Sequence, residues 1–421
     1  MTAITNEPAN WSATQKVVFR FCFIFFILYI FFEPNGVLPM SDWLSGIYLE
    51  PFHTLIPRLA KHVLRMAQPV VIEQTGSGDT TYDYLIMLFI IVLAFIGMLI
   101  WSVTGRDTKN YNKLYYWLCV FVRYYVAITM VVYGSIKIVK LQFPAPGFYR
   151  LMEPVGNMSP MGLAWTYMGY STGFNYITGL AEFSCGVLLF FRRTTTLGAI
   201  VGIVVAGNVM AVNYCFDVPV KLLSTMLVVM CIFLLFRDYH RLVNFFFKNK
   251  DAAPSNLSPH RFRAKGKNIA LIVVKCLLIV WVLYTDLFTA LYYGSPDDAK
   301  KPPFYGVYKV QYFIRGKDTL PPLITDTVRW RKLLIDESAN VQLMDDSLIS
   351  YQFIPDTVHH HFIISRHKYI LRYTVLKPDT ILLQGTWKKD SVQIKLVKQP
   401  VNAFPLMSRG FHWVNEVGYN R

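Results

Sequence analysis

The sequence predicts an α-helical polytopic membrane bundle of about seven spans, followed by a C-terminal all-β barrel or meander domain. Three observations predict this fold class. Hydrophobic residues make up 54% of the 421 residues, charged residues make up only 16%, and the apolar residues occur in long blocks. Soluble domains contain about a quarter charged residues. From Tyr305 onward the hydrophobic period changes from about 3.6 to about 2, which is typical of strands.

The predicted spans are the segments with about 20 largely apolar residues, the length that a membrane helix needs. They are residues 17–38, 84–104, 115–139, 174–191, 195–216, 218–236 and 268–292. Glu33, Pro34 and Asn35 follow the apolar core of the first segment, and no small-x-small cleavage site is present. We therefore expect the first span to be a retained anchor and not a signal peptide.

Basic residues predict the orientation. The connections at 105–114, 192–193 and 237–267 are rich in Lys and Arg and alternate with less basic ones. The positive-inside rule places them in the cytoplasm. The expected location is the cell (inner) membrane, with a cytoplasmic N-terminus and an extracytoplasmic C-terminal domain. The net charge of +16 belongs largely to these connections, so the predicted partner is the lipid bilayer and no nucleic acid is expected.

The predicted organisation has five parts. Residues 1–114 supply two N-terminal spans with an extracytoplasmic loop, and residues 115–245 form a four-helix membrane domain. Residues 246–267 are a basic cytoplasmic linker, residues 268–292 form the seventh span, and residues 293–421 form the extracytoplasmic β domain.

Two further segments lie outside the spans. Residues 51–67 have a helical period with a basic face, which predicts a helix that lies on the membrane or packs on the outer domain. The loop at 142–173 is rich in Gly, Pro, Met and aromatic residues. Such a loop is too apolar to be solvated freely, and we expect it to fold back over the bundle as a lid or re-entrant cap, either structural or at a ligand entrance.

Short motifs in the four-helix region carry a family resemblance. They are YGSIK at 133–137, TGLAE at 178–182, GVLL at 186–189 and NYCFDVPVK at 213–221. With them the region resembles the DoxX family of small four-helix membrane proteins. The resemblance implies a four-helix bundle. Some members are associated with membrane redox chemistry, as quinone-linked thiosulfate oxidoreductase subunits or as partners of oxidative-stress enzymes.

The C-terminal strands carry a second resemblance. GVY at 306–308 opens a strand, RW at 329–330 follows a loop, and LQGTW at 383–387 precedes DSV at 390–392. In these features the segment looks like a lipocalin-type β-barrel, which implies either one apolar ligand or a solidly packed interior. His359, His360 and His361 are consecutive, so on a strand they point to opposite faces and cannot converge on one metal ion.

Ionisable and polar groups within the spans are the candidate site, because such groups are costly in a bilayer unless they have a role. The candidates for ligand binding or proton relay fall in the outer half of the bundle: Lys137, Glu182, Asn213, Asp217 and Lys221. An acid and a base at similar depth either form a structural pair or bind a quinone or anion head group. Arg123 is a membrane-embedded charge whose head group could reach cytoplasmic water.

The predicted function is binding of a small lipophilic molecule, with a quinone as the candidate cofactor, in support of membrane redox or envelope maintenance. Two alternatives stay open: a small-molecule transporter or exporter, and a non-catalytic scaffold whose β domain recruits an envelope protein. The sequence contains no Gly-x-Ser-x-Gly, phosphate-binding loop, dinucleotide fingerprint or His-Glu-x-x-His motif. No catalytic residue or metal ligand is therefore assigned, and enzyme activity stays an open question.

Overall fold

The computed structural model describes residues 10–37, 41–72, 76–252, 254, 262–336, 338–364, 369–400 and 403–417. The chain divides into two compact units. The first unit comprises Met1–Gln142 and Gly173–Gly294, and the second comprises Phe143–Thr172 and Ser295–Arg421.

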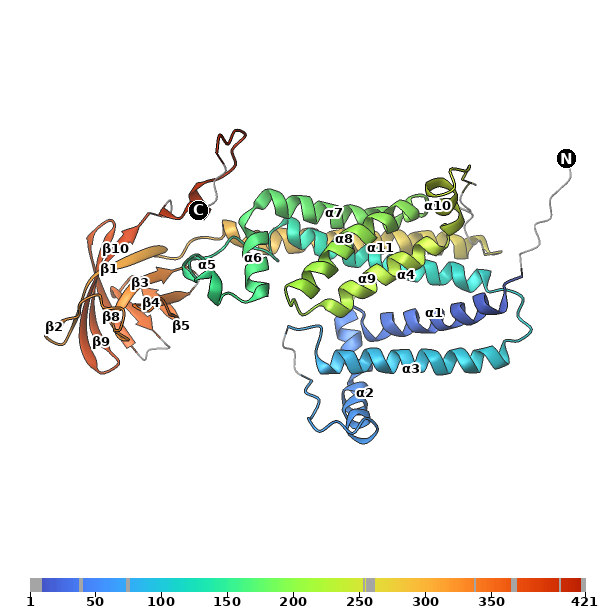
Figure 1. Ribbon diagram of the computed structural model, residues 1–421, viewed down its shortest axis with the longest axis horizontal. Helices are drawn as coiled ribbons and strands as arrows, with labels where there is room; N and C mark the ends of the chain where they lie inside the picture. Colours follow the sequence, from blue (N-terminus) through green and yellow to red (C-terminus); the bar gives the residue numbers. More distant parts are fainter. Residues whose placement is uncertain are drawn as a thin grey trace. The chain divides into compact units, whose positions relative to one another are not determined.

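The first unit is helical (Figure 1). Its elements are α1 (Ala13–Phe32), α2 (Ser41–His62), α3 (Thr81–Thr104), α4 (Asn112–Ile138), α7 (Thr172–Phe190), the short η2 (Arg192–Thr194), α8 (Thr195–Cys215), α9 (Lys221–Phe236), α10 (Tyr239–Phe246) and α11 (Lys265–Tyr293). Among the described residues, 6 helices are long and apolar enough to cross a membrane, namely α1, α3, α4, α7, α8 and α11. The bent pair of α9 and α10 would be a further span if it is counted as one.

Two predicted spans extend past a turn that limits the helix in the structure. The first was predicted to run to residue 38, but α1 ends at Phe32, because the residue before Pro34 is disfavoured in the helical conformation. The sixth was predicted from residue 218, but α9 begins only at Lys221. Asp217 has a φ of 51° and Pro219 follows it, so the chain turns here before the helix starts. Helix α9 also bends by 82° into α10.

Helix α2 overlaps the surface helix predicted at 51–67, but it begins earlier, at Ser41, and ends earlier, at His62. It lies crosswise to α1 and α3 (Figure 1). Ile56 and Ala60 are buried, and Phe52 packs against the apolar core of the unit. Trp43 and Ile47 are exposed, so one apolar face of α2 is covered and another is open.

Helix α4 occupies the centre of the bundle, where it contacts α1, α9 and α11. It carries fully buried apolar residues on successive turns, such as Leu118, Val122 and Val126. A helix that is apolar on all sides is one that neighbours surround. The position of α4 therefore follows directly from its composition.

Glycines bring α4 and α7 into backbone contact. A Cβ added at Gly134 would lie 2.7 Å from the carbonyl oxygen of Gly179, and one added at Gly179 would lie 2.8 Å from the carbonyl oxygen of Gly134. A Cβ at Gly186 would lie 2.5 Å from the Ala127 carbonyl oxygen. Small residues of this kind let membrane helices approach closely and gain dispersion energy. The pairing of α4 and α7 thus depends on the absence of three side chains.

This contact gives a stability prediction. Gly134→Ala should lower the free energy of unfolding by about 1–3 kcal/mol, because the added methyl group forces the two backbones apart. Gly207→Ala on α8 is the matched control, because nothing lies within 4 Å of its Cβ position. That change should be neutral or slightly stabilising, since Ala favours a helix. Thermal unfolding of both variants in detergent checks this, and equal midpoints would contradict the close contact.

The second unit contains an antiparallel sheet that curves into a half-barrel (Figure 1). Its strands are β1 (Gly306–Arg315), β2 (Asp318–Thr319), β3 (Trp330–Ile335), β4 (Ala339–Leu343), β5 (Leu348–Tyr351), β6 (Phe353–Asp356), β7 (His361–Ile364), β8 (Tyr369–Lys377), β9 (Thr380–Trp387) and β10 (Asp390–Gln399). Their order is β5-β4-β3-β1-β10-β9-β8-β7-β6, with β2 paired to β1. The predicted C-terminal β domain is therefore confirmed at the level of an antiparallel, barrel-like sheet.

Aromatic side chains fill the space inside this sheet. The rings of Trp330 and Trp387 pack edge to face at 5.0 Å, and the Tyr351 ring lies 5.2 Å from Trp387. The cavity that remains between them measures about 10 Å³, so it has room for one water molecule at most. The lipocalin resemblance implies either a ligand-binding interior or a solidly packed one, and this part of the sheet is solidly packed.

The opposite face of the sheet packs against the segment at 143–172, which contains α5 (Phe148–Met152), η1 (Val155–Asn157) and α6 (Pro160–Tyr170). Phe148 forms a small buried cluster with Val307 and Leu334. Its backbone N–H donates to Asp336 Oδ2 at 3.2 Å. The loop was predicted to fold back over the bundle, whereas in the structure it belongs to the second unit and its helix α5 packs on the β-sheet. The remaining short helices of this unit are η3 (Pro296–Asp298) and α12 (Pro405–Ser408).

A turn that contains His359 and His360 joins β6 to β7. His360 has a φ of 52°, as the turn requires, and the side chain of His359 is exposed. The Asp356 carboxylate accepts the N–H groups of His359 and Val358 at 2.9 Å. These hydrogen bonds, together with the contact between His359 Nδ1 and Asp356, lower the pKa of Asp356 to about 2. The cluster acts as a turn cap.

Candidate functional site

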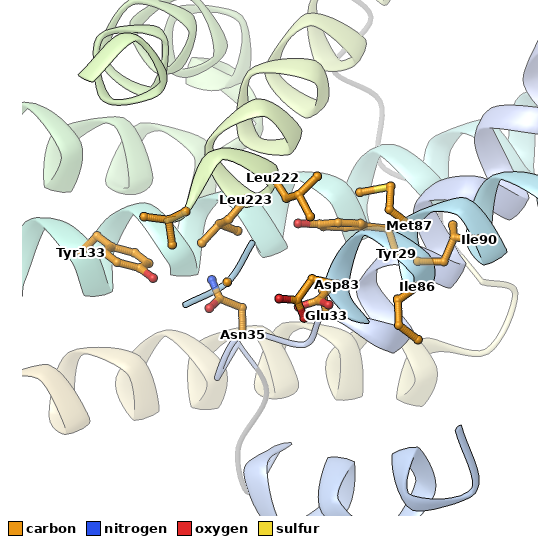
Figure 2. Close-up of a pocket in the computed structure, with 12 residues that line it drawn as sticks. Tyr29, Glu33, Asn35, Asp83, Ile86, Met87, Ile90, Tyr133, Leu222 and Leu223 are labelled. Atoms are coloured by element: carbon orange, nitrogen blue, oxygen red, sulfur yellow. The ribbon is translucent and has the colours of Figure 1, made fainter. Parts of the chain in front are cut away.

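A cavity of about 120 Å³ lies in the first unit, between α3, α4, α9 and the end of α1 (Figure 2). Its lining consists of Tyr29, Glu33, Asn35, Gly78, Asp83, Ile86, Met87, Ile90, Tyr133, Val220, Leu222 and Leu223. For comparison, an apolar protein cavity of about 150 Å³ holds one benzene molecule. This cavity therefore has room for one ring-sized group or a few water molecules.

The end of α1 supplies part of the polar wall. Helix α1 stops at Phe32, and Asn35 and Gly36 then turn the chain with φ values of 47° and 66°. The turn leaves the side chains of Glu33 and Asn35 directed toward the cavity (Figure 2). The backbone carbonyl of Glu33 is held in place because it accepts the hydroxyl of Tyr125 at 2.8 Å.

The start of α3 supplies the second acid. Asp83 lies in the first turn, where its Oδ2 accepts the N–H and the hydroxyl of Thr80, each at 2.7 Å. This reciprocal capping pair fixes where α3 begins and where its carboxylate lies. In Figure 2 the side chains of Glu33 and Asp83 lie side by side at one edge of the cavity.

The rest of the lining is apolar or phenolic. Ile86, Met87 and Ile90 follow Asp83 along one side of α3, and Leu222 and Leu223 come from the start of α9. The phenol of Tyr133 approaches from α4 and that of Tyr29 from α1. Among the described residues that line the cavity none is basic. It therefore combines apolar walls with an edge of two acids and two phenols.

Gly78 and Val220 form another part of the cavity wall, and Asp79 holds their two segments together. Its two carboxylate oxygens accept the backbone N–H groups of Lys221 at 2.7 Å and Leu222 at 2.9 Å. A carboxylate at a helix N-terminus satisfies orphan donors and interacts well with the helix dipole. The loop before α3 is thereby fixed to the start of α9.

Three of the sequence-predicted residues lie around this α8–α9 turn. The ammonium group of Lys221 pairs with Asp217 at 2.9 Å and approaches Asp79 at 3.8 Å. Asn213 is buried and donates to the Val220 carbonyl at 3.2 Å and to Ser224 Oγ at 3.0 Å. None of these three side chains is part of the cavity lining, so in this structure they hold the turn that shapes the wall.

The other two predicted residues meet in the bundle. Lys137 on α4 and Glu182 on α7 form a buried ion pair, and their exposed fractions are 6% and 2%. Each lies three residues after a contact glycine, Gly134 and Gly179, so the close backbone approach brings them onto facing surfaces. Glu182 Oε2 has no hydrogen-bond partner among the described residues. Tyr133 lies one helical turn from Lys137, next to the cavity.

Arg123 lies within the bundle and is 6% exposed. Its guanidinium donates to Thr195 Oγ1 at 3.2 Å and lies over the Tyr124 ring at 5.2 Å. The sequence suggested that its head group could reach water by extending along the helix. The structure instead covers it with the start of α8.

Glu33, Asp83, Tyr29 and Tyr133 line the cavity and were not among the predicted site residues. A signal for the two acids was present, because Glu33 follows the first span and Asp83 precedes the second, which places both on one side of the predicted topology. The phenols gave no comparable signal, since Tyr is common throughout the spans.

The ion pair gives the next prediction. Glu182→Gln removes the carboxylate that neutralises buried Lys137 and should lower the free energy of unfolding by about 3–5 kcal/mol. Asp390→Asn is the control, because its pair with Arg315 at 2.6 Å is about 40% exposed and should contribute only about 0–1 kcal/mol. Denaturation midpoints in detergent check both. A Glu182→Gln loss as small as that of the control would mean that the pair is not structural.

Comparison with known proteins found one informative relative. A segment of 126 residues is 35% identical to the uncharacterized protein YwoB of Bacillus subtilis (strain 168), and it spans 30% of this chain and 79% of that protein. No family model matches the chain. No solved structure matches it either.

Proposed function

This chain belongs to the same family as YwoB, whose description assigns no activity, so we propose a function from the residues of the chain itself. We propose that it is an integral membrane protein that binds the head group of a small lipophilic molecule. The binding site is the cavity between α1, α3, α4 and α9. The observation that carries the proposal is a ring-sized cavity with apolar walls and one polar edge. Such a combination orients a ligand by a few polar contacts and retains it by apolar ones.

The membrane location rests on the six long apolar helices and on the distribution of basic residues. We take α9 as a seventh span. Its 16 residues extend about 24 Å, which is shorter than the hydrocarbon core of about 30 Å, so the adjoining residues of the α8–α9 turn and of α10 complete the crossing. The basic connections on either side of the α8–α9 hairpin also require the chain to cross twice. The N-terminus is then cytoplasmic, and the second unit is extracytoplasmic.

This topology gives a labelling prediction. A cysteine at exposed Ser391 in the second unit should react with a membrane-impermeant maleimide in intact cells, whereas one at exposed Lys109 should react only after lysis. The unsubstituted chain, whose native cysteines are present in both variants, supplies the background. The reverse pattern would overturn the orientation, and labelling of both in intact cells would mean that the number of spans is wrong.

A quinone fits the cavity chemistry. The ring would pack on Ile86, Ile90 and Leu223, and its carbonyl oxygens would accept hydrogen bonds from the phenols of Tyr29 and Tyr133. The acids beside these phenols, Glu33 and Asp83, would hold or exchange protons next to the ring oxygens. A bound quinone would be consistent with a role in membrane redox or envelope maintenance, which the DoxX resemblance implies.

Ligand retention tests the proposal. Leu223→Trp should fill the cavity and remove a co-purifying quinone or lipid, which mass spectrometry of the detergent-purified protein quantifies. Leu99→Trp, at an exposed position on α3, is the matched control and should retain it. Tyr133→Phe should weaken binding of a short-chain benzoquinone by roughly tenfold, the effect of one buried hydrogen bond. If all three variants bind as the unsubstituted protein does, the cavity is not the site.

A second candidate follows from the packed interior of the half-barrel. Because Trp330 and Trp387 occupy the space where a barrel ligand would bind, the second unit is better suited to contact an envelope protein than to hold a small molecule. This scaffold role and ligand binding in the bundle are compatible. A transporter would in addition need a path to the opposite side of the membrane.

A further inference from the structure

Three cations gather in the first unit, far along α4 from the cavity-lining Tyr133. They are Arg123 on α4, Arg192 on η2 and Lys275 on α11, and each lies over an aromatic ring. The paired rings are Tyr124 at 5.2 Å from Arg123, Tyr116 at 5.5 Å from Arg192, and Phe191 at 5.3 Å from Lys275. A ring face stabilises a cation without neutralising it. The positive charge of the cluster is therefore retained.

The three side chains meet at the α7–α8 turn, because Arg123 contacts Thr195, Lys275 lies over Phe191, and Arg192 lies between these two positions in the chain. In the described parts of the chain, neither Arg123 nor Lys275 forms an ion pair with a carboxylate. Asp238, between α9 and α10, accepts hydrogen bonds from the hydroxyl of Thr196 at 2.5 Å and from the guanidinium of Arg241 at 2.8 Å. Two cations without a carboxylate partner, one buried and one half-buried, are costly unless an anion joins them.

Arg123 supplies an independent sign of an absent acceptor. The side chain is 6% exposed, and its Nε has no hydrogen-bond partner among the described residues. One terminal nitrogen donates to Thr195 Oγ1. A buried donor without an acceptor costs free energy, and a guanidinium fork suits the paired oxygens of a phosphate.

The depth of the cluster matches a lipid head group. The turn between α7 and α8 contains Arg192 and Arg193, and such a turn does not lie in the hydrocarbon region. Arg123 contacts Thr195 at the end of this turn. Helices α4 and α11 have 27 and 29 residues, more than the roughly 20 that a span needs. Arg123 and Lys275 lie within these helices, and their long side chains extend to the turn, at Thr195 and Phe191, where a head group can reach them.

We infer that Arg123, Arg192 and Lys275 form a binding site for a phosphate-bearing anion. The two guanidinium groups provide directional donors and the Lys275 ammonium provides a point charge. The phosphate group could come from either of two molecules: the head group of an anionic phospholipid or free inorganic phosphate. The inference does not depend on the cavity or on its ligand.

The experiment titrates the full-length protein in a neutral detergent with phosphatidylglycerol, phosphatidylcholine or inorganic phosphate, and measures the unfolding midpoint and bound lipid by native mass spectrometry. Arg192→Gln and Lys275→Gln should each require about fivefold more phosphatidylglycerol for the same stabilisation. The matched controls are Arg193→Gln and Lys267→Gln, exposed neighbours on the same elements. Lys275→Arg keeps the charge and should retain binding.

Stabilisation by phosphatidylglycerol but not by phosphatidylcholine or phosphate supports the site with a lipid source. Equal stabilisation by inorganic phosphate supports it with a free anion. Two results would overturn the inference: no response of the unsubstituted protein to either anion, or a response of Arg192→Gln and Lys275→Gln equal to that of their controls. Because Lys275 is only half-buried, its variants test the site even if changes at Arg123 prevent folding.

Discussion

The backbone contact between α4 and α7 is the constraint on which the rest of the first unit depends. In a bilayer, lipid chains are as apolar as leucine side chains, so helices associate by close packing and polar contacts and not by apolar burial alone. Gly134, Gly179 and Gly186 permit that packing. The same approach brings Lys137 against Glu182, which would each be too costly to bury alone. Packing and charge pairing therefore stabilise one another.

The cavity arises where this tight packing ends. Helix α1 terminates before Pro34, α3 begins with its capping pair at Asp83, and α9 begins where Asp79 caps it. Each of these ends is fixed by local hydrogen bonds and turn geometry, so their side chains cannot collapse freely into the space between them. A cavity held open by helix termini also has polar groups at its edge, because termini are where capping side chains occur.

Much of the fold could be predicted because it is encoded locally. Apolar runs of about 20 residues identify the helices, and alternation with turn residues identifies the strands. The pairing of Lys137 with Glu182 could be anticipated from equal depth. The cavity could not be anticipated, because it depends on contacts remote in sequence. Asp79 and Lys221 are separated by 142 positions, and nothing in either segment alone indicates that they meet. Sequence reasoning thus singled out Asp217, Lys221 and Asn213 for their polarity, although these residues hold the turn behind the cavity wall.

The distribution of charge along α4 links the two proposed sites. Tyr133 faces a cavity whose described lining includes acids but no base, whereas Arg123, ten positions earlier, belongs to a cluster of bases. Ten residues correspond to about 15 Å along a helix, roughly half the hydrocarbon thickness. In the proposed topology, the basic group would lie toward the cytoplasmic side, where anionic lipid head groups are abundant. The acidic cavity would lie toward the opposite side. One central helix therefore presents two chemically distinct environments, and an anion that suits the basic cluster is disfavoured beside the acids of the cavity.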